Sequence, residues 1–278
     1  MPSFDTPEPI IASLDFEVGN VRITAGKRTD TVVEVLPSNG AEEADVKAVQ
    51  QTKITYANGT LTVKGAKKRS PFGRHGSIDI TVELPEGSRL HSTSPMGDYI
   101  GEGTLGECRV KTSLGDISLG ETGPANLRTG HGAVRLDRAT GPVEISAAGR
   151  IDIGEITGTA TVKNSNGETV IREVTDALEV TSANGGVTVD TAHASVEVKS
   201  SNGPIRVNDV ARGVVRLQAS AHDIEVGIRA STAAWLDVNT RIGTVRNALD
   251  AAEAPDTSDD TVEIHARTSV GDIVIRRA

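Results

Sequence analysis

Residues 178–210 read LEVTSANGGVTVDTAHASVEVKSSNGPIRVNDV, and this stretch contains the same pattern twice. An alternating segment comes first, then an Asn-Gly turn, then a second alternating segment, and the order begins again 18 residues later. Because successive side chains of a strand lie on opposite faces, each segment predicts a strand with one apolar and one polar face. The stretch therefore predicts a repeating strand–turn–strand–turn unit.

The glycine of this turn recurs through most of the chain. Counted from Gly97, the column contains Gly115, Gly132, Gly149, Gly167, Gly185, Gly203, His222, Gly243 and Gly271. Successive members are 18, 17, 17, 18, 18, 18, 19, 21 and 28 residues apart. The pattern Gly-x-apolar-x-apolar occurs at least nine times among 29 glycines, whereas chance at 37% hydrophobic residues gives about four. Glycine is expected at a corner where the backbone needs a positive φ.

Units of this length cannot bury their apolar face alone, so they are expected to stack on one another. A parallel β-helix achieves this, because equivalent residues of successive rungs then lie about 4.8 Å apart. The sequence therefore predicts an all-β fold, a single-stranded parallel β-helix or solenoid with rungs of about 17–21 residues. A left-handed hexapeptide helix has rungs of similar length, but this chain shows two apolar pairs per rung, and the crossover rule favours the right-handed form.

The chain divides into two parts that are continuous with each other. Residues 1–90 predict an irregular N-terminal β cap, whose strands cover the open end of the solenoid. Residues 91–278 predict the rungs, with an acidic loop at 247–260 between the last two of them. We expect one structural domain overall, in which Arg276 and Arg277 follow the final strand and discourage end-to-end pairing.

One short helix is expected inside the cap. It covers residues 41–51 and is entered from Ser38 and Asn39, which are residue types that cap helices well. Residues 53–63 contain an Asn-Gly pair between two alternating segments, which predicts a β-hairpin.

Charge and composition exclude several classes of protein. The chain has 29 Lys and Arg against 38 Asp and Glu, a net charge of −9, which argues against nucleic acid as the partner. It contains no apolar stretch of the roughly 20 residues that a membrane span needs, and its first residues do not resemble a secretory signal. Its single cysteine allows no intrachain disulfide. We therefore expect a cytoplasmic protein without a membrane span.

Two acidic residues follow corner glycines on consecutive rungs. Asp98 and Asp116 are expected to lie about 5 Å apart, a distance at which two carboxylates can bind a cation or share a proton. The simpler interpretation is a pair of solvated turn residues, because Gly-Asp favours turns for local reasons. A calcium column would need acids on many rungs, yet the same position holds Ala133, Arg150 and Gly186. We therefore predict no metal, no cofactor and no catalytic residue.

Other polar residues also align with the repeat. Asn166, Asn184 and Asn202 fall on three successive rungs, which predicts a ladder of side-chain amides that hydrogen-bond to one another, with ligand binding as the alternative. No two histidines have the spacing of zinc ligands, so exposed turn positions are expected for them. The six histidines are His75, His91, His131, His193, His222 and His265.

Three further features have a functional and a simpler interpretation. Residues 67–75 form a basic loop with Lys67, Lys68, Arg69, Arg74 and His75, and Phe72 at its tip. This loop could touch lipid headgroups or an acidic partner, although a charge run is more often simply solvated. Cys108 shares its strand face with Val110, which predicts a buried thiol rather than a nucleophile. Trp235 either covers the last rungs or offers a small sticky patch.

Several motifs together resemble a bacterial family of β-strand-repeat proteins known as putative adhesins, whose function is not established. The motifs are GNVRI at 19–23, ITVELP at 80–85, and the turns TSLGDI at 112–117 and TSVGDI at 268–273. The resemblance covers nearly the whole chain and implies a β-helical or β-solenoid fold. It implies no catalytic residue that can be carried over to this sequence.

The repeat and the lack of a reactive constellation predict a non-catalytic β-solenoid that acts as an interaction scaffold for a protein partner. The resemblance suggests a link to bacterial envelope or stress processes. One alternative is a carbohydrate-active β-helix enzyme that uses carboxylates such as Asp98 and Asp116, although six aromatic residues supply little for a sugar cleft. A second alternative is a self-polymerising cytoskeletal β-helix. The sequence leaves monomer and homo-oligomer open.

Overall fold

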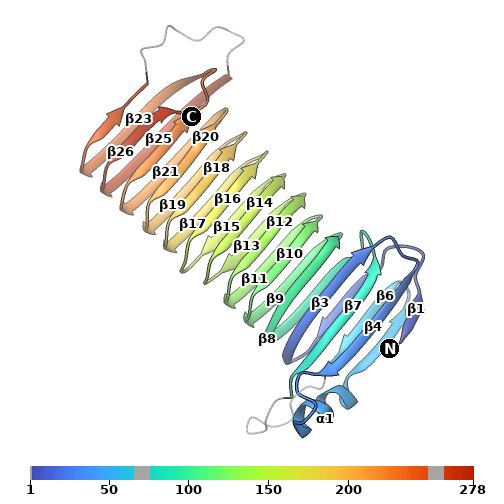
Figure 1. The fold of residues 1–278 in the computed structure, drawn as a ribbon. Helices are drawn as coiled ribbons and strands as arrows, with labels where there is room; N and C mark the ends of the chain where they lie inside the picture. The colour runs from blue at the N-terminus through green and yellow to red at the C-terminus, as the bar shows by residue number, and fades with distance from the viewer. Residues whose placement is uncertain (1, 66–75, 250–259) are drawn as a thin grey trace. The chain divides into compact units, whose positions relative to one another are not determined.

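The computed structural model describes residues 2–65, 76–249 and 260–278. It divides into two compact units, residues 1–140 and 141–278, which we call unit 1 and unit 2. Both units are built mainly from parallel strands, and one helix occurs among the described residues. The chain therefore has the all-β fold that the repeat predicts (Figure 1).

The described residues of unit 1 form one helix and twelve strands. In two parallel ladders, the strand order is β6-β2-β8-β9-β11 and β7-β3-β8-β10-β12, with β8 bending from the first ladder into the second. The elements are β1 (Ser3–Asp5), β2 (Ile11–Asp15), β3 (Val18–Gly26), β4 (Asp30–Pro37), α1 (Glu43–Gln51), β5 (Lys53–Ala57), β6 (Thr60–Lys64), β7 (Ile78–Pro85), β8 (Arg89–Thr104), β9 (Cys108–Leu114), β10 (Ile117–Thr122), β11 (Ala125–His131) and β12 (Val134–Thr140).

Unit 2 repeats the same two-ladder arrangement. Its ladders run β13-β15-β17-β19-β21-β25-β23 and β14-β16-β18-β20-β22-β26-β24, all parallel. The strands are β13 (Val143–Ala147), β14 (Ile151–Thr157), β15 (Ala160–Asn164), β16 (Thr169–Val174), β17 (Leu178–Asn184), β18 (Val187–Ala192), β19 (Val196–Asn202), β20 (Ile205–Val210), β21 (Gly213–Ala221), β22 (Ile224–Ile228), β23 (Thr232–Ile242), β24 (Val245–Asn247), β25 (Asp260–Val270) and β26 (Ile273–Arg277).

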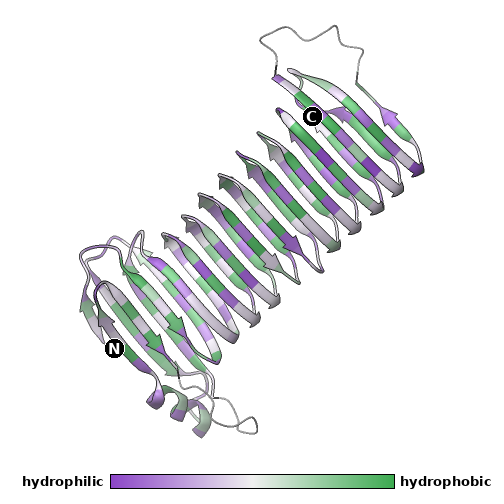
Figure 2. Ribbon diagram, turned by 180° about the vertical axis from the view of Figure 1, so that it is seen from behind, coloured by the Kyte–Doolittle hydropathy of each residue, from purple (hydrophilic) through white to green (hydrophobic). Residues whose placement is uncertain are grey.

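The register of the ladders matches the repeat of the sequence. Leu178 lies opposite Val196, and Asn184 lies opposite Asn202, so equivalent residues of successive rungs stack directly. The inward positions of these strands are buried and their outward positions are largely exposed, and Figure 2 shows the resulting alternation along the strands. The core is mostly Val, Ile, Leu and Ala. Aliphatic burial between stacked rungs is therefore the main stabilising contribution.

The rung order at the end of unit 2 differs from the order in the sequence. We expected the rungs at His222, Gly243 and Gly271 to follow one another, but β25 lies between β21 and β23, and β26 lies between β22 and β24. The inserted rung carries Ile264 and Ile273, both completely buried. A rung with such large inward side chains gains most from neighbours on both sides, whereas the more polar β23 is left at the edge.

The expected role of the C-terminal arginines is wrong for the same reason. Arg276 and Arg277 belong to β26, which is flanked by two strands and is not the last of its ladder. Arg276 Nε donates to Glu225 Oε1 at 2.7 Å, and Arg277 Nη1 donates to the carbonyl oxygens of Arg229 and Thr232. Both side chains therefore bind neighbouring segments of unit 2.

The first strands of unit 1 are also exchanged relative to the sequence. The rung β6–β7 lies outside β2–β3, because β2 and β3 pair with β8 on their other side. Beyond this rung, β4 and β5 pair antiparallel with β7 and β6, and β1 pairs antiparallel with β4. The hairpin predicted at residues 53–63 is confirmed as β5–β6, with positive φ at Asn58 and Gly59.

The helix is confirmed over Glu43–Gln51, but its predicted caps are wrong. Glu42 occupies the N-cap and makes no side-chain capping bond. Ser38 bonds instead to Ser77, and the Asn39 side chain accepts the N–H of Ala41. The buried Asp45 carboxylate accepts the backbone N–H groups of Asn39 and Ser77, which ties the start of the helix to the segments on either side of it.

Three predictions are neither supported nor contradicted by these observations. They are the right-handed winding, the boundary between a cap at 1–90 and rungs at 91–278, and the single domain. Within the described ranges, the structure contains no helix with the length and apolar character needed to cross a bilayer.

Candidate interaction surface

The two candidate carboxylates of unit 1 accept hydrogen bonds from backbone N–H groups of the next rung. Asp98 Oδ1 accepts the N–H of Asp116 at 2.8 Å, and Asp116 Oδ1 accepts the N–H of Ala133 at 2.7 Å. The predicted alignment on consecutive rungs is therefore present, but each carboxylate caps a turn. The same geometry occurs in unit 2, where Asp223 Oδ1 accepts the N–H of Asp272. The recurrence of aspartate after the corner residue was the sequence signal for this structural role.

Replacing Asp116 with alanine should lower the free energy of unfolding by about 1 kcal/mol, because the N–H of Ala133 loses its charged acceptor. Asp116→Asn should cost less, since the amide oxygen can still accept this bond. Urea unfolding followed by circular dichroism measures both values. Equal losses for the two variants would contradict the capping role.

The asparagine column aligns as expected but does not form the predicted amide ladder. Asn184 Nδ2 donates to the carbonyl oxygen of Ser165 at 3.3 Å. Asn202 Oδ1 lies 3.0 Å from His222 Nε2. In this part of unit 2 the Asn184 side chain thus bonds to the backbone and the Asn202 side chain to a histidine.

Two histidines of unit 2 lie at a corner and within a strand, His222 and His265 respectively. His222 stands at a corner with φ +90°, where glycine is usual. His265 Nε2 lies 2.6 Å from Glu263 Oε1, and its Nδ1 lies 3.3 Å from Asp237 Oδ2. Within the ranges that the structure covers, no three His, Cys, Asp or Glu side chains are grouped as a metal ion would need.

Cys108 is fully buried in β9, as its strand face predicts. Burial raises the pKa of its thiol to about 12, with the charge of Glu107 adding to this effect and a backbone hydrogen bond from Leu90 opposing it. The thiol is therefore protonated at neutral pH, which is the opposite of what a nucleophilic cysteine needs. The basic loop at 67–75 lies outside the described residues.

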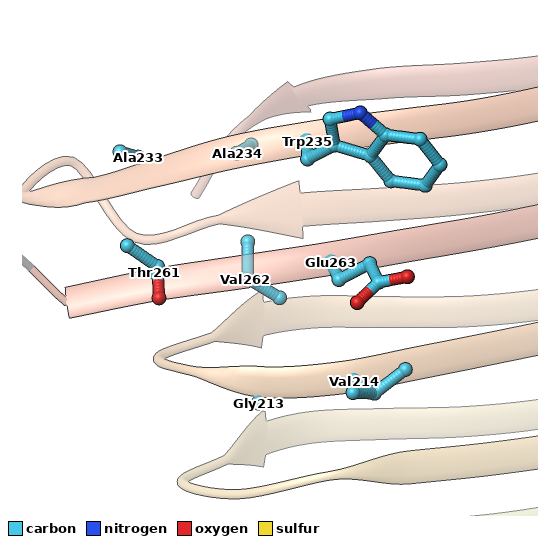
Figure 3. A pocket seen from close by; sticks show the side chains of 8 residues that line it. All are labelled: Gly213, Val214, Ala233, Ala234, Trp235, Thr261, Val262 and Glu263. Carbon is cyan, nitrogen blue, oxygen red and sulfur yellow. The ribbon is translucent and has the colours of Figure 1, made fainter. Parts of the chain in front are cut away.

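An apolar groove crosses the outward face of β21, β25 and β23. Val214, Glu263 and Trp235 occupy equivalent outward positions on these three strands. The groove has a volume of about 730 Å³, and its lining side chains come from three neighbouring strands, with the Trp235 ring the largest of them (Figure 3). We call this feature the Trp235 surface; it is lined by Gly213, Val214, Ala233, Ala234, Trp235, Thr261, Val262 and Glu263.

Charged side chains border the Trp235 surface. The Trp235 and His265 rings meet edge to face with centroids 5.4 Å apart. Asp237 Oδ2 accepts hydrogen bonds from His265 and from Arg267 Nη2, the latter at 3.1 Å. These two hydrogen bonds hold the pKa of Asp237 below its usual value, and the bond from His265 has the larger effect. The border, which we call the charged rim, therefore consists of Asp237, His265 and Arg267.

Sequence reasoning names Trp235 as a small sticky patch in one of two interpretations, but it does not name Val214. Val214 and Trp235 are apolar residues at outward strand positions, where the alternation predicts polar ones. Taken singly, exposed apolar residues are normal. The two side chains become one surface only because β25 lies between their strands, and that placement depends on the exchanged rung order.

The stacked rungs, corner glycines and aspartate caps define a parallel β-solenoid protein. The sequence model of the Toastrack DUF4097 family matches residues 11–277, so this chain belongs to that family. The match confirms the resemblance to bacterial putative adhesins. No curated protein matches the chain.

Solved bacterial structures are similar to the chain over its whole length. A putative adhesin from Bacteroides fragilis is 14% identical, with 100% of this chain and 96% of that chain covered and a TM-score of 0.41. A putative cell adhesion protein from Clostridium sporogenes is 12% identical, with coverages of 100% and 98% and a TM-score of 0.21. A putative lipid binding protein from Parabacteroides distasonis is 10% identical, with coverages of 100% and 95% and a TM-score of 0.29.

Proposed function

We propose that this chain is a non-catalytic β-solenoid scaffold that binds a protein partner through the Trp235 surface. The observation that carries this proposal is the exposure of Trp235, whose residue surface is 57% accessible although it stands beside an apolar groove. Tryptophan is among the residues most enriched at the energetic centre of protein interfaces. Trp235 does not stand singly but forms one apolar surface with Val214, and contiguous apolar surfaces of this kind mark binding sites.

The surroundings of Trp235 have the anatomy of a protein interface. An apolar centre is formed by Val214, Ala233 and Trp235, and the small side chain of Ala233 leaves room for a side chain of the partner. The charged rim lies beside this centre and offers both signs of charge, from Asp237 and from Arg267. Such a polar border orients a partner and excludes poorly matched ones.

The state of the reactive groups supports a binding role over catalysis. Asp98 and Asp116 each accept a backbone N–H, and Cys108 is buried and protonated. A non-catalytic solenoid acts by binding, and the Trp235 surface is the place where we expect a partner to bind. The cytoplasmic location stays a prediction, which fractionation of the native cells would test.

The test is crosslinking and pull-down from the native cell with wild-type protein and two variants. Trp235→Ala should lose the specific partner, because it removes the largest apolar side chain of the surface. Leu114→Ala is the matched control, since Leu114 is also apolar and 46% exposed but belongs to β9 of unit 1. Thermal unfolding checks that both variants are folded. A partner list unchanged by Trp235→Ala would reject the proposal.

A further inference from the structure

The rung β23–β24 is the outermost rung of unit 2. Among the described strands, β23 pairs with β25 alone and β24 pairs with β26 alone. Within the described residues, no strand pairs with the other edge of β23 or of β24, and such an edge presents backbone N–H and C=O groups. β23 is an 11-residue strand, and an exposed edge of that length is a template for pairing with another chain.

The interior of this rung is incompletely covered. Leu236 and Val238 lie opposite Ile264 and Ala266 of β25. The two β25 residues are completely buried, whereas Leu236 and Val238 are only partly buried. The aliphatic core of unit 2 thus continues up to the edge, and no further rung covers it in the part of the unit that the structure describes.

Exposed apolar side chains are concentrated at the same place. All the large hydrophobic side chains that are exposed in the described part of unit 2 belong to β23, β24 or β25. They are Trp235, Ile242, Val245 and Val270. The earlier rungs of this unit bury their aliphatic residues, so the exposure is a property of its outermost rungs.

We propose that a second copy of this chain covers the edge, with β23 of one copy pairing antiparallel with β23 of the other around a two-fold axis. A single extended peptide could pair with only one of the two ladders. A second copy brings a β23 and a β24 edge together with an aliphatic interior, so it continues both ladders and the core at once. Such a two-fold contact uses the same surface on both copies and closes after two.

Among the registers that strand parity allows, charge favours one for this contact. A register must place inward residues opposite inward residues, or the aliphatic faces are exposed. With Asn239 on the axis, this condition holds, and Asp237 of each copy lies opposite Arg241 of the other. Centring on Asp237 or on Arg241 would instead oppose like charges, which is destabilising in cross-strand pairs. The edge is therefore self-complementary in one arrangement.

The edges of unit 1 do not offer an equivalent contact. Its strands β1 and β5, each paired on one side among the described strands, are three and five residues long and antiparallel to their neighbours. Repeated end-to-end addition of copies is therefore not expected. The inference predicts a closed dimer and goes beyond the partner binding proposed above, because Trp235 faces outward from the β23 ladder.

Light scattering after size exclusion should give twice the mass of one chain for the wild-type protein. Arg241→Asp and Asp237→Arg, each alone, should give the mass of one chain, because each places like charges opposite one another. An equal mixture of the two variants should restore the dimer, since every cross-strand pair then joins opposite charges. Arg135→Asp is the control: its side chain is 63% exposed on β12 and should leave the dimer intact.

A second variant reports on the register directly. Asn239→Cys should form an intermolecular disulfide on mild oxidation, because residues on the axis of an antiparallel pair lie within disulfide distance. The native Cys108 is buried and should not contribute. A wild-type monomer at high concentration, a mass that grows beyond two copies, or a dimer indifferent to both charge variants would each overturn the proposal. These readouts use purified protein alone, so they are independent of the Trp235→Ala partner test.

Discussion

Replacing Gly185 with alanine should lower the free energy of unfolding by about 2–4 kcal/mol. Gly185 has φ +115°, a conformation that residues with a side chain rarely adopt. In addition, an added Cβ would overlap the backbone carbonyl of Gly167 on the neighbouring rung. Because that obstacle is backbone, no side-chain rotation relieves it, and the rungs themselves must shift.

The adjacent Gly186 provides a matched control. A Cβ at Gly186 would meet Pro204 Cγ at 3.4 Å, which is an ordinary contact distance. Gly186→Ala should therefore change the stability by less than about 1 kcal/mol. Urea unfolding followed by circular dichroism compares the two variants. If both variants lost a similar free energy of unfolding, the positive φ and the close carbonyl of Gly167 would not be what requires glycine at position 185.

Asn164→Asp should be the second strongly destabilising change, by about 3–5 kcal/mol at neutral pH. Asn164 is 3% exposed, and its Nδ2 donates to the carbonyl oxygens of Gly149 and Gly167, each at 3.0 Å, and to Thr169 Oγ1 at 3.1 Å. Aspartate has nearly the same shape but no amide donors. It would place a buried negative charge among oxygen atoms.

This loss should depend on pH with a definite sign. Burial among acceptors raises the pKa of the new carboxyl group above its unfolded value of about 3.9. The part of the destabilisation that comes from the charge is therefore absent well below pH ~3.9 and grows as the pH rises toward the folded pKa. Unfolding of Asn164→Asp and of the exposed control Asn166→Asp should be compared at pH 5 and pH 8. A difference between the two variants that does not grow with pH would contradict the network.

The Asn164 network illustrates what a strand pattern cannot reveal. Thr169 is a polar residue at an inward position of β16, and it is completely buried. Its partner, however, reaches it from the preceding strand and bonds also to two corner carbonyls. A hydrogen-bond network of this kind depends on where three separate segments meet, whereas alternation reports only which face a residue occupies.

The sequence alone determined the rung period, the strand faces and the corner positions. These features depend on local alternation and on turn conformation, both of which are encoded within about 20 residues. The structure decided the order of the outermost rungs, the capping role of Asp98 and Asp116, and the assembly of the Trp235 surface. Every rung carries nearly the same pattern, so many stacking orders satisfy it equally. The order that forms is the one that covers the largest aliphatic side chains on both sides, and only three-dimensional packing distinguishes it.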